Sequence, residues 1–598
     1  MRRAERRARK EVEPQVSQQS LLCRSLHIAA LVNLGVAQPL YAVLGANAEF
    51  FAVRRSHPVD LVLLTLLLSF GLPALVVAVE SAVDRVSGRA GPMLHLALVA
   101  ATIGLCTLPA FARALETARG AVAGALLAGA AGAWAYARLD AARWVATLLA
   151  AAVLVVPALF LLHSPVRKLL FPYGHPARMA VLASHRPVPV VLVVFDELPV
   201  VSLFDAAYRI DQAVYPNFFR LAQDSTWYRL ASTVHQSTTK ALSAILTGSH
   251  PVPGRMPTFR DYPLNLFTML EGSYELHAFE SVTTMLPDAE RSPARLADRM
   301  TLLAADSAAI YLHAVLPAPL AASLAPPVNG RWIDYWSLDV NRSVTVAGRD
   351  SARTRYDRFR SSLRGNRPQQ FGLFLDDIGA DSHRALYFVH ILLPHVPYQY
   401  GPDGRARPVP RDWRDREGVR GDWPADDPEK AAASYRRHLS QVRYVDVVLG
   451  QLLDRLRETG IYDDCLLIVT ADHGVSFRPG SDRREPDPDN YLDILHVPLF
   501  VKAPAQSGGR IVDDPVLTID IVPTIADVLG LDLPWPLDGR SLLESRKSVA
   551  PQPVVIRSRG KTFAFDRPTL VSAFSASLER RQVMASLHGG PGASDDSD

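Results

Sequence analysis

Cysteine is scarce in this chain, and its scarcity excludes several kinds of site. Among 598 residues only Cys23, Cys106 and Cys465 are cysteines, and they lie far apart. A disulfide framework, a CxxC redox motif and a cysteine-rich zinc site all need more cysteines or closer spacing. The cellular compartment therefore has to be inferred from membrane topology rather than from cysteine usage.

A strong excess of one charge is also missing. Lys and Arg number 64 while Asp and Glu number 60, which gives a formal net charge of +4. Because there is no basic stripe with interleaved aromatic residues, we expect no nucleic-acid partner. The mean hydropathy is nevertheless +0.08 although 21% of the residues are charged. Apolar residues must therefore be concentrated in one part of the chain, which indicates a membrane domain.

Five long apolar stretches lie within the first 163 residues. They cover residues 25–46, 59–80, 93–112, 120–138 and 142–163. Each is long enough to cross about 30 Å of hydrocarbon, and five in succession rarely occur in the core of a soluble protein. We therefore expect residues 25–163 to form a membrane domain with five transmembrane helices. Because further spans follow the first, it is expected to be an anchor rather than a cleaved signal peptide.

The distribution of basic residues predicts the orientation. The chain begins with MRRAERRARK, and short basic segments tend to stay on the cytoplasmic side of a membrane. Residues 1–24 are accordingly expected to form a basic cytoplasmic N-terminus. An odd number of crossings then places everything after about residue 164 on the extracytoplasmic side.

From about residue 187 the pattern becomes that of an α/β domain. PVVLVVFDELP and CLLIVTADHG are apolar runs that end in acids, as buried parallel strands do. Residues 429–459 carry Val and Leu at helical spacing, which predicts an amphipathic helix packed on the sheet. We expect a linker over 164–186 and an α/β domain over 187–545, with a mixed, largely parallel sheet flanked by helices. A C-terminal extension over 546–598 should follow, with a disordered end.

Candidate metal ligands stand at the ends of the expected strands. Carboxylates and neutral imidazoles together favour zinc or manganese, with calcium or magnesium as the alternatives. Each side chain alone has an ordinary explanation, as a solvated strand end, a turn or a core histidine, so only their joint occurrence favours a metal site. The candidates are Asp196, Glu197, His390, His395, Asp472, His473 and His496.

A candidate nucleophile lies in the segment TTKALSAILTG, residues 238–248. Its apolar residues follow helical spacing and Gly248 is suited to end the helix, so Thr238 lies near the helix N-terminus. A threonine there commonly caps the helix. The same position suits a tetrahedral oxyanion, and metal coordination would lower the pKa of the hydroxyl enough for attack. The two roles are compatible.

The order of these segments becomes specific when they are taken together. Over about residues 187–545, the order of these segments resembles that of the sulfatase branch of the alkaline phosphatase superfamily. The segments are VVLVVFDE, TTKALSAILTG, HILLPHVPY, VTADHG, HVPLFVKAP and TIDIVPTIADVLGL with DGRSLL. Five membrane spans before such a domain resemble the layout of lipoteichoic acid synthases and lipid A phosphoethanolamine transferases. The resemblance implies an integral, multi-pass protein of a bacterial inner or plasma membrane with an extracytoplasmic catalytic domain. It also implies one or two divalent metal ions and a covalent intermediate on the nucleophile.

The resemblance assigns a role to each candidate by its position. Thr238 matches the nucleophile, which also contacts metal. Asp472 and His473 match ligands of the first metal, and Asp196 or Glu197 matches the acidic ligand that opens the site. The resemblance further matches His395 and His496 to histidines that bind a second metal or the transferred group, with His390 a weaker candidate.

The chain also departs from the family pattern at three places. At the first metal site sulfatases show paired aspartates and the transferases a single Glu, whereas this chain has Asp196 followed by Glu197, which leaves open which of the two is the ligand. Sulfatases that use formylglycine carry Cys or Ser followed by x-Pro-x-Arg, whereas the same register here reads TTKAL. Formylglycine chemistry is therefore excluded, and Lys240 is the residue expected to supply positive charge, as a point charge rather than an Arg fork. The disulfides common in the phosphoethanolamine transferases are impossible with Cys465 alone in the domain.

Three functions remain in consideration. The leading interpretation is a membrane-anchored enzyme that moves a phospho-substituent from a lipid-linked donor to an envelope glycan or lipid through phospho-Thr238. A membrane-anchored hydrolase of sulfate or phosphate esters is the alternative, and it differs in whether water resolves the intermediate. An inactive envelope scaffold with the same fold is the alternative of another class. The lipid bilayer is an expected partner in each case.

Overall fold

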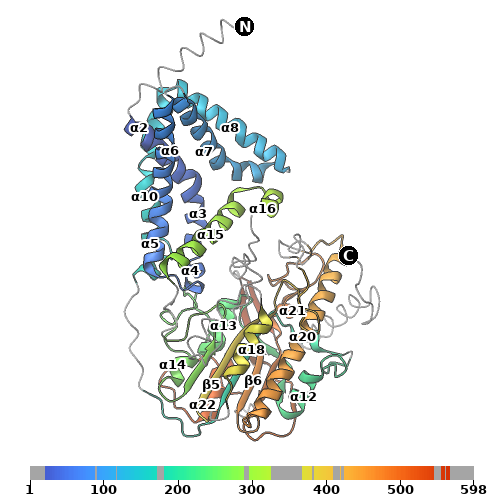
Figure 1. Ribbon diagram of the computed structural model, residues 1–598. Coiled ribbons are helices and arrows are strands. Elements are labelled where there is room, and N and C mark those ends of the chain that lie inside the picture. Colours follow the sequence, from blue (N-terminus) through green and yellow to red (C-terminus); the bar gives the residue numbers. More distant parts are fainter. Residues whose placement is uncertain are drawn as a thin grey trace. The chain divides into compact units, whose positions relative to one another are not determined.

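The structure is a computed structural model, and it divides into two compact units. It describes residues 21–87, 90–115, 117–171, 181–205, 207–287, 295–324, 366–379, 383–408, 416, 418, 423–543, 554–558 and 561–565. The first unit comprises residues 1–175 and 291–337, and the second comprises 176–290 and 338–598 (Figure 1). Most of the basic N-terminus and the end of the C-terminal extension lie outside the described residues.

The first unit is a bundle of apolar helices. Five of them are long and apolar enough to cross a membrane: Leu22–Ala46, Pro58–Val86, Ala90–Ala114, Ala118–Arg138 and Asp140–His163. This confirms the prediction of five helices of membrane length. The elements that build them are α2 (Leu21–Val32), η1 (Asn33–Ala37), α3 (Gln38–Ala46), α5 (Pro58–Leu66), η2 (Leu67–Gly71), α6 (Leu72–Val86), α7 (Ala90–Ala114), α8 (Ala118–Arg138), α9 (Asp140–Leu149), α10 (Ala152–Ala158) and η3 (Leu159–His163). Two short helices, α4 (Glu49–Val53) and α11 (Arg167–Leu170), also belong to this unit.

Two of the spans contain a π-helical turn where they meet. η1 and η2 each come two residues before a proline, Pro39 and Pro73. A proline lacks the N–H that the α-helix needs and its ring clashes with the preceding turn, which a wider turn relieves. The side-chain amide Nδ2 of Asn33 in η1 donates to the carbonyl oxygen of Ser69 in η2 at 2.9 Å, and this hydrogen bond joins the two turns.

A helix from the middle of the chain completes the first unit. α15 (Leu296–Val315) packs on α3, α5 and α7, and α16 (Ala318–Leu324) follows it. Arg299 pairs with Asp60 at 2.9 Å, and Arg54 pairs with Asp306. The described residues 295–324 therefore belong to the helical unit, although the sequence pattern placed them inside a continuous domain over 187–545.

A seven-stranded sheet forms the centre of the second unit. Its order is β4-β5-β1-β6-β7-β2-β8. Four neighbouring pairs are parallel, while β7 runs antiparallel to both β6 and β2. This confirms the expected mixed, largely parallel sheet. The strands are β1 (Val190–Asp196), β2 (Thr226–Tyr228), β4 (Glu275–Phe279), β5 (Ala385–Pro394), β6 (Leu466–Ala471), β7 (Leu499–Lys502) and β8 (Arg510–Val512).

Helices cover this sheet, and Figure 1 shows α18 and α20 lying across its strands. The expected amphipathic helix is α20 (Pro428–Glu458), which matches residues 429–459 closely. The helices are α12 (Pro216–Asp224), α13 (Thr238–Thr247), α14 (Leu266–Leu270), α18 (Arg367–Asp377), α20, α21 (Tyr491–Leu495) and α22 (Ile521–Leu529). Small elements complete the unit: η4 (Val200–Leu203), β3 (Ala231–Ser232), β9 (Val516–Leu517), η7 (Thr518–Asp520), β10 (Val554–Ser558) and β11 (Lys561–Phe565).

Side chains along the central strands alternate between the two faces of the sheet, and this alternation decides which residues face away from the apolar core. Val191, Val193 and Phe195 of β1 pack in the same core as the apolar residues of α12, α18 and α20. Because successive side chains of a strand point to opposite faces, Val194 is directed away from that core. His390 is its register partner on β5 and lies on the same face.

Candidate active site

Two carboxylates meet because two parallel neighbouring strands end side by side. Asp196 is the last residue of β1, and Asp472 directly follows β6. The strands pair in register up to Phe195 and Ala471, so the two acids that follow lie next to each other at the same edge of the sheet. Carboxyl ends of parallel strands are where α/β proteins commonly place their ligands.

Asp196, Asp472 and His473 form a group whose ligand atoms lie within 4.8 Å of one another. His473 Nε2 lies 3.2 Å from Asp472 Oδ2 and 3.7 Å from Asp196 Oδ1. His390 Nε2 lies 4.0 Å from one oxygen of each carboxylate. All four side chains are fully buried.

Several of these buried atoms lack a hydrogen-bond partner. Within the described part of the chain, neither oxygen of Asp196 has one, nor do Asp472 Oδ2 and His390 Nε2. Buried polar atoms are almost always paired, because leaving one unpaired costs about 1–3 kcal/mol. These unpaired atoms of Asp196, Asp472 and His390, with His473 Nε2 beside them, fit a divalent metal ion, and the mixed nitrogen and oxygen donors suit zinc or manganese.

The pKa values of this group reflect the same crowding. Burial, with the nearby charges of Asp472 and Glu197, raises the pKa of Asp196 well above its usual range. Burial raises the pKa of Asp472 to about 7. Burial and the Arg484 cation lower the pKa of His473 well below its usual range, so its ring is neutral at pH 7, the protonation state that a metal ligand requires.

Thr238 brings a hydroxyl to this group. It is the first residue of α13, and Thr238 Oγ1 lies 3.0 Å from His473 Nε2. The residue that precedes the helix as N-cap is Ser237, so the hydroxyl of Thr238 is not engaged in capping. α13 ends at Gly248, whose left-handed conformation, with φ 67°, suits glycine.

Glu197 occupies a different environment from its neighbour Asp196. Its backbone has φ 62°, which turns the chain directly after the strand. Its carboxylate pairs with Arg483 and Arg484, and His395 Nε2 lies 3.5 Å from Glu197 Oε1. Burial alone would raise the pKa of Glu197, but Arg483, His395 and Arg484 hold that pKa well below its usual range.

Arg483 and Arg484 are site residues that the sequence analysis missed. Arg484 Nη2 also lies 2.6 Å from His473 Nε2 and donates to the carbonyl oxygen of Gln236 at 2.8 Å. Arg483 Nη2 donates to Tyr398 Oη at 3.0 Å. Both arginines lie in a loop without apolar periodicity, so the only signal in the sequence was the adjacent pair itself.

Three sequence candidates are not among the converging ligand atoms found in the described residues. Lys240 Nζ donates to the carbonyl oxygen of Arg255 at 2.6 Å. His395 contacts Glu197, as described above, and burial lowers its pKa to about 3. His496 is fully buried, and its backbone forms a bridge with Ser232.

Comparison with known proteins identifies part of the second unit. The sulfatase family model matches residues 351–531, which include His390, Asp472, His473 and both arginines but neither Asp196 nor Thr238. The second unit therefore has a sulfatase-like α/β fold, and residues 351–531 match the sulfatase family model.

Curated relatives match over short segments. The chain is 30% identical over 108 residues to an extracellular sulfatase SULF-1 homolog of Drosophila melanogaster, covering 18% of this chain and 10% of that protein. It is 30% identical over 130 residues to a choline-sulfatase of Rhizobium meliloti, covering 19% and 22%. It is 36% identical over 102 residues to the multifunctional alkaline phosphatase superfamily protein PehA of Trinickia caryophylli, covering 17% and 19%. The matches thus span about a tenth to a fifth of these relatives.

Solved structures cover more of the chain at lower identity. A phosphonate monoester hydrolase of Silicibacter pomeroyi is 21% identical, with a TM-score of 0.38 over 62% of this chain and 79% of that one. The C-terminal periplasmic domain of EcEptC from Escherichia coli, solved in complex with Zn, is 14% identical, with a TM-score of 0.39 over 66% and 97%.

Proposed function

We propose that this protein is a membrane-anchored enzyme that transfers a phospho-substituent from a lipid donor to an envelope glycan or lipid, through a covalent bond to Thr238. The observation that carries the proposal is the 3.0 Å approach of Thr238 Oγ1 to His473 Nε2, beside the unpaired carboxylate oxygens of Asp196 and Asp472 Oδ2. Five helices of membrane length in the same chain favour a lipid-borne donor. We further propose that the catalytic domain faces the extracytoplasmic side.

The residues that would hold the metal are Asp196, Asp472 and His473, with His390 beside them. A bound divalent ion supplies charge that favours the ionised hydroxyl and the negative oxygens of the substrate. Arg484 contributes a fixed cation next to His473, where negative charge develops on the group under attack. Glu197 holds both guanidinium groups in place through its ion pairs.

The transfer proceeds in two balanced halves. In the first, Thr238 Oγ1 forms a bond to phosphorus while the bond from phosphorus to the oxygen of the donor lipid breaks, and the proton lost by Thr238 ends on that oxygen. In the second, the oxygen of an acceptor hydroxyl forms a bond to phosphorus while the bond from phosphorus to Thr238 Oγ1 breaks, and the proton lost by the acceptor hydroxyl ends on Thr238 Oγ1.

The amino-acid type at position 238 supports phosphoryl rather than formylglycine chemistry. Formylglycine is made from Cys or Ser, and neither residue stands at this position. A threonine hydroxyl can form a phosphoester directly and be restored when that ester is broken.

Mass spectrometry of Thr238 tests the proposal. The full chain, incubated with native membranes, should carry a phospho-substituent on Thr238. Thr238→Ala should abolish this adduct, and Thr238→Ser should retain part of it because the hydroxyl survives. Thr239→Ala is the matched control and should keep most of the adduct, since its side chain points about 100° away around the helix. An adduct on Thr239, or turnover by Thr238→Ala, would reject the assignment.

A membrane-anchored ester hydrolase is the second candidate, favoured by the names of the curated relatives, which include two sulfatases. It uses the same nucleophile but lets water break the intermediate. Following the labelled group separates the two functions, because a hydrolase releases it as a free anion while a transferase delivers it to an acceptor.

A further inference from the structure

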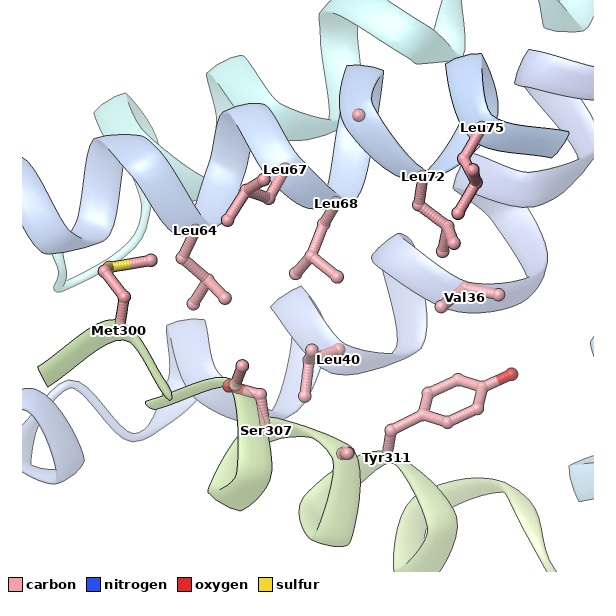
Figure 2. A pocket seen from close by; sticks show the side chains of 13 residues that line it. Val36, Leu40, Leu64, Leu67, Leu68, Leu72, Leu75, Met300, Ser307 and Tyr311 are labelled. Atoms are coloured by element: carbon pink, nitrogen blue, oxygen red, sulfur yellow. The ribbon is translucent and has the colours of Figure 1, made fainter. Parts of the chain in front are cut away.

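An apolar groove runs through the first unit, apart from the candidate active site. It has a volume of about 460 Å³ and is lined by residues of α3, of α5 to α6 through η2, and of α15. Figure 2 shows Leu64, Leu68 and Leu72 directed from one helix toward Leu40 on the second and the α15 side chains on the third. Its volume lies in the range of about 300–1,000 Å³ that is typical of small-molecule sites.

Polar contacts fix the wall that α15 provides. Arg299 and Asp60 form two hydrogen bonds of 2.9 Å, and Arg54 pairs with Asp306. Tyr311 Oη donates to the carbonyl oxygen of Gly35 at 2.8 Å, inside the π-helical turn η1. Because π-helical turns occur often at functional sites, their position beside the groove adds weight to a binding role.

The lining selects a hydrocarbon rather than a polar ligand. Ser307 and Tyr311 alone bring side-chain oxygens to it, and the Tyr311 oxygen is already engaged with Gly35. Leu67 and Leu75 line the groove and are 53% and 61% exposed, so the groove opens sideways out of the bundle. Around helices of membrane length, what lies beyond such an opening is the acyl region of the bilayer.

We propose that this groove holds one hydrocarbon chain of the lipid donor, which enters from the bilayer between the second span and α15. From Leu64 to Leu75 the groove follows roughly 16 Å of helix, at 1.5 Å per residue, which is about half the thickness of the hydrocarbon region. The inference rests on the proposed function in so far as the lipid is the donor.

Photocrosslinking of the full chain tests the occupancy of the groove. The protein is placed in vesicles of phosphatidylethanolamine and phosphatidylglycerol, a small share of which carry a diazirine in one acyl chain. Crosslinking should concentrate on residues 64–75 and 300–311. Its yield there should be about tenfold higher than at the exposed leucines Leu126 and Leu127 of α8, which corresponds to a binding preference of about 1.4 kcal/mol.

Variants that fill the groove provide the control. Ala304 and Ala308 line the groove and are exposed, so Ala304→Phe and Ala308→Phe add bulk without displacing the core. Both should lower groove labelling about tenfold, toward the level of bulk lipid. Ala297→Phe is the matched control, because Ala297 is exposed on the same helix but does not line the groove. Equal labelling of groove and α8, or no change in the filled variants, would mean that no lipid chain occupies the groove and would overturn the proposal.

The test separates this proposal from the proposed function. Labelling is also measured in Thr238→Ala, which should show the same groove label because binding does not need the nucleophile. Groove label without a Thr238 adduct in the unmodified protein would reject the proposed function and leave the lipid site standing. A Thr238 adduct without groove label would reject the lipid site alone.

Discussion

Asp196 and Glu197 are adjacent in the chain, yet they meet opposite electrostatic environments. Asp196 has neighbours of its own charge, and no described group hydrogen-bonds its oxygens, whereas Glu197 is neutralised by two arginines. The positive φ at Glu197 turns the chain directly after the strand, and this turn places the two side chains in different surroundings. We therefore favour Asp196 as the ligand, a choice that the sequence alone left open.

Paired substitutions test this choice. Asp196→Asn should reduce divalent-metal affinity by more than about a hundredfold, because even outer-shell partners of a metal cost up to that much. Glu197→Gln should keep the metal but destabilise the protein by about 3–5 kcal/mol, since it leaves buried guanidinium charge uncompensated. Metal content of the purified chain and its unfolding midpoint are the two measurements. Loss of metal only in Glu197→Gln would make Glu197 the ligand.

The raised pKa values of the carboxylates predict how metal binding depends on pH. The pKa of Asp472 is about 7 and that of Asp196 is well above its usual range, so protons occupy the pair below pH 7 in the metal-free protein. A metal ion must displace these protons, and its affinity should therefore rise as the pH increases toward 7. His473 adds little to this trend, because its ring is already neutral there.

Calorimetry in two buffers of different ionisation enthalpy measures the effect. We expect release of about one to two protons per metal near pH 6, with the share from Asp472 decreasing as the pH rises through its pKa of about 7. A metal-binding enthalpy that is independent of the buffer would contradict protonated carboxylates in the free site.

At the scale of elements, sequence periodicity predicted much of the second unit. The apolar runs before Asp196 and Asp472 became β1 and β6, and the helical spacing over 429–459 became α20, because burial on a sheet imposes these patterns locally. The helix beginning at Thr238 followed from the same reasoning.

The position of α15 is a feature that sequence periodicity could not predict. Its place in the first unit depends on ion pairs with Arg54 and Asp60, about 240 to 250 residues earlier in the chain. Charged residues at its contact face resemble a solvated helix until their distant partners are known. Arg483 and Arg484 were missed for the same reason, since their partner Glu197 is 286 and 287 residues away.

The turn after β6 is an element whose geometry can be tested. A Cβ on Gly474 would lie 2.2 Å from the carbonyl oxygen of Asp493 and 2.9 Å from Pro199 Cβ. Gly474→Ala should therefore displace the turn that carries His473, destabilise the protein by about 1–3 kcal/mol and weaken metal binding. Thermal unfolding with and without metal measures both effects.

Gly508 provides the matched control for that substitution. Nothing lies within 4 Å of a Cβ at this position, so Gly508→Ala should change neither stability nor metal binding. If Gly474→Ala behaves like Gly508→Ala, the close packing of the turn does not position the ligand.

At the scale of the whole molecule, the number of helices of membrane length relates the side of the N-terminus to the side of the sulfatase-like domain. If all five helices of membrane length cross a membrane, the two ends of the helical bundle lie on opposite sides of it, whichever way the bundle inserts. The basic start of the chain, MRRAERRARK, then favours the cytoplasm for the N-terminus and the extracytoplasmic side for the sulfatase-like domain.

Two fusions of a reporter that works only in the cytoplasm test this topology. Placed after Asp598, the reporter should be silent. Inserted beside Ser87, between the second and third spans, it should be active, because two crossings return the chain to the starting side. The two fusions together show which part of the predicted topology is wrong. Activity after Asp598 with silence beside Ser87 would mean that the N-terminus lies outside. Activity at both positions would mean that one of the later spans does not cross the membrane. The Gly- and Ala-rich helix Ala118–Arg138, with the lowest hydropathy among the later spans, would then be the first to re-examine, since a segment of weak lipid-facing hydrophobicity depends most on its neighbours for insertion.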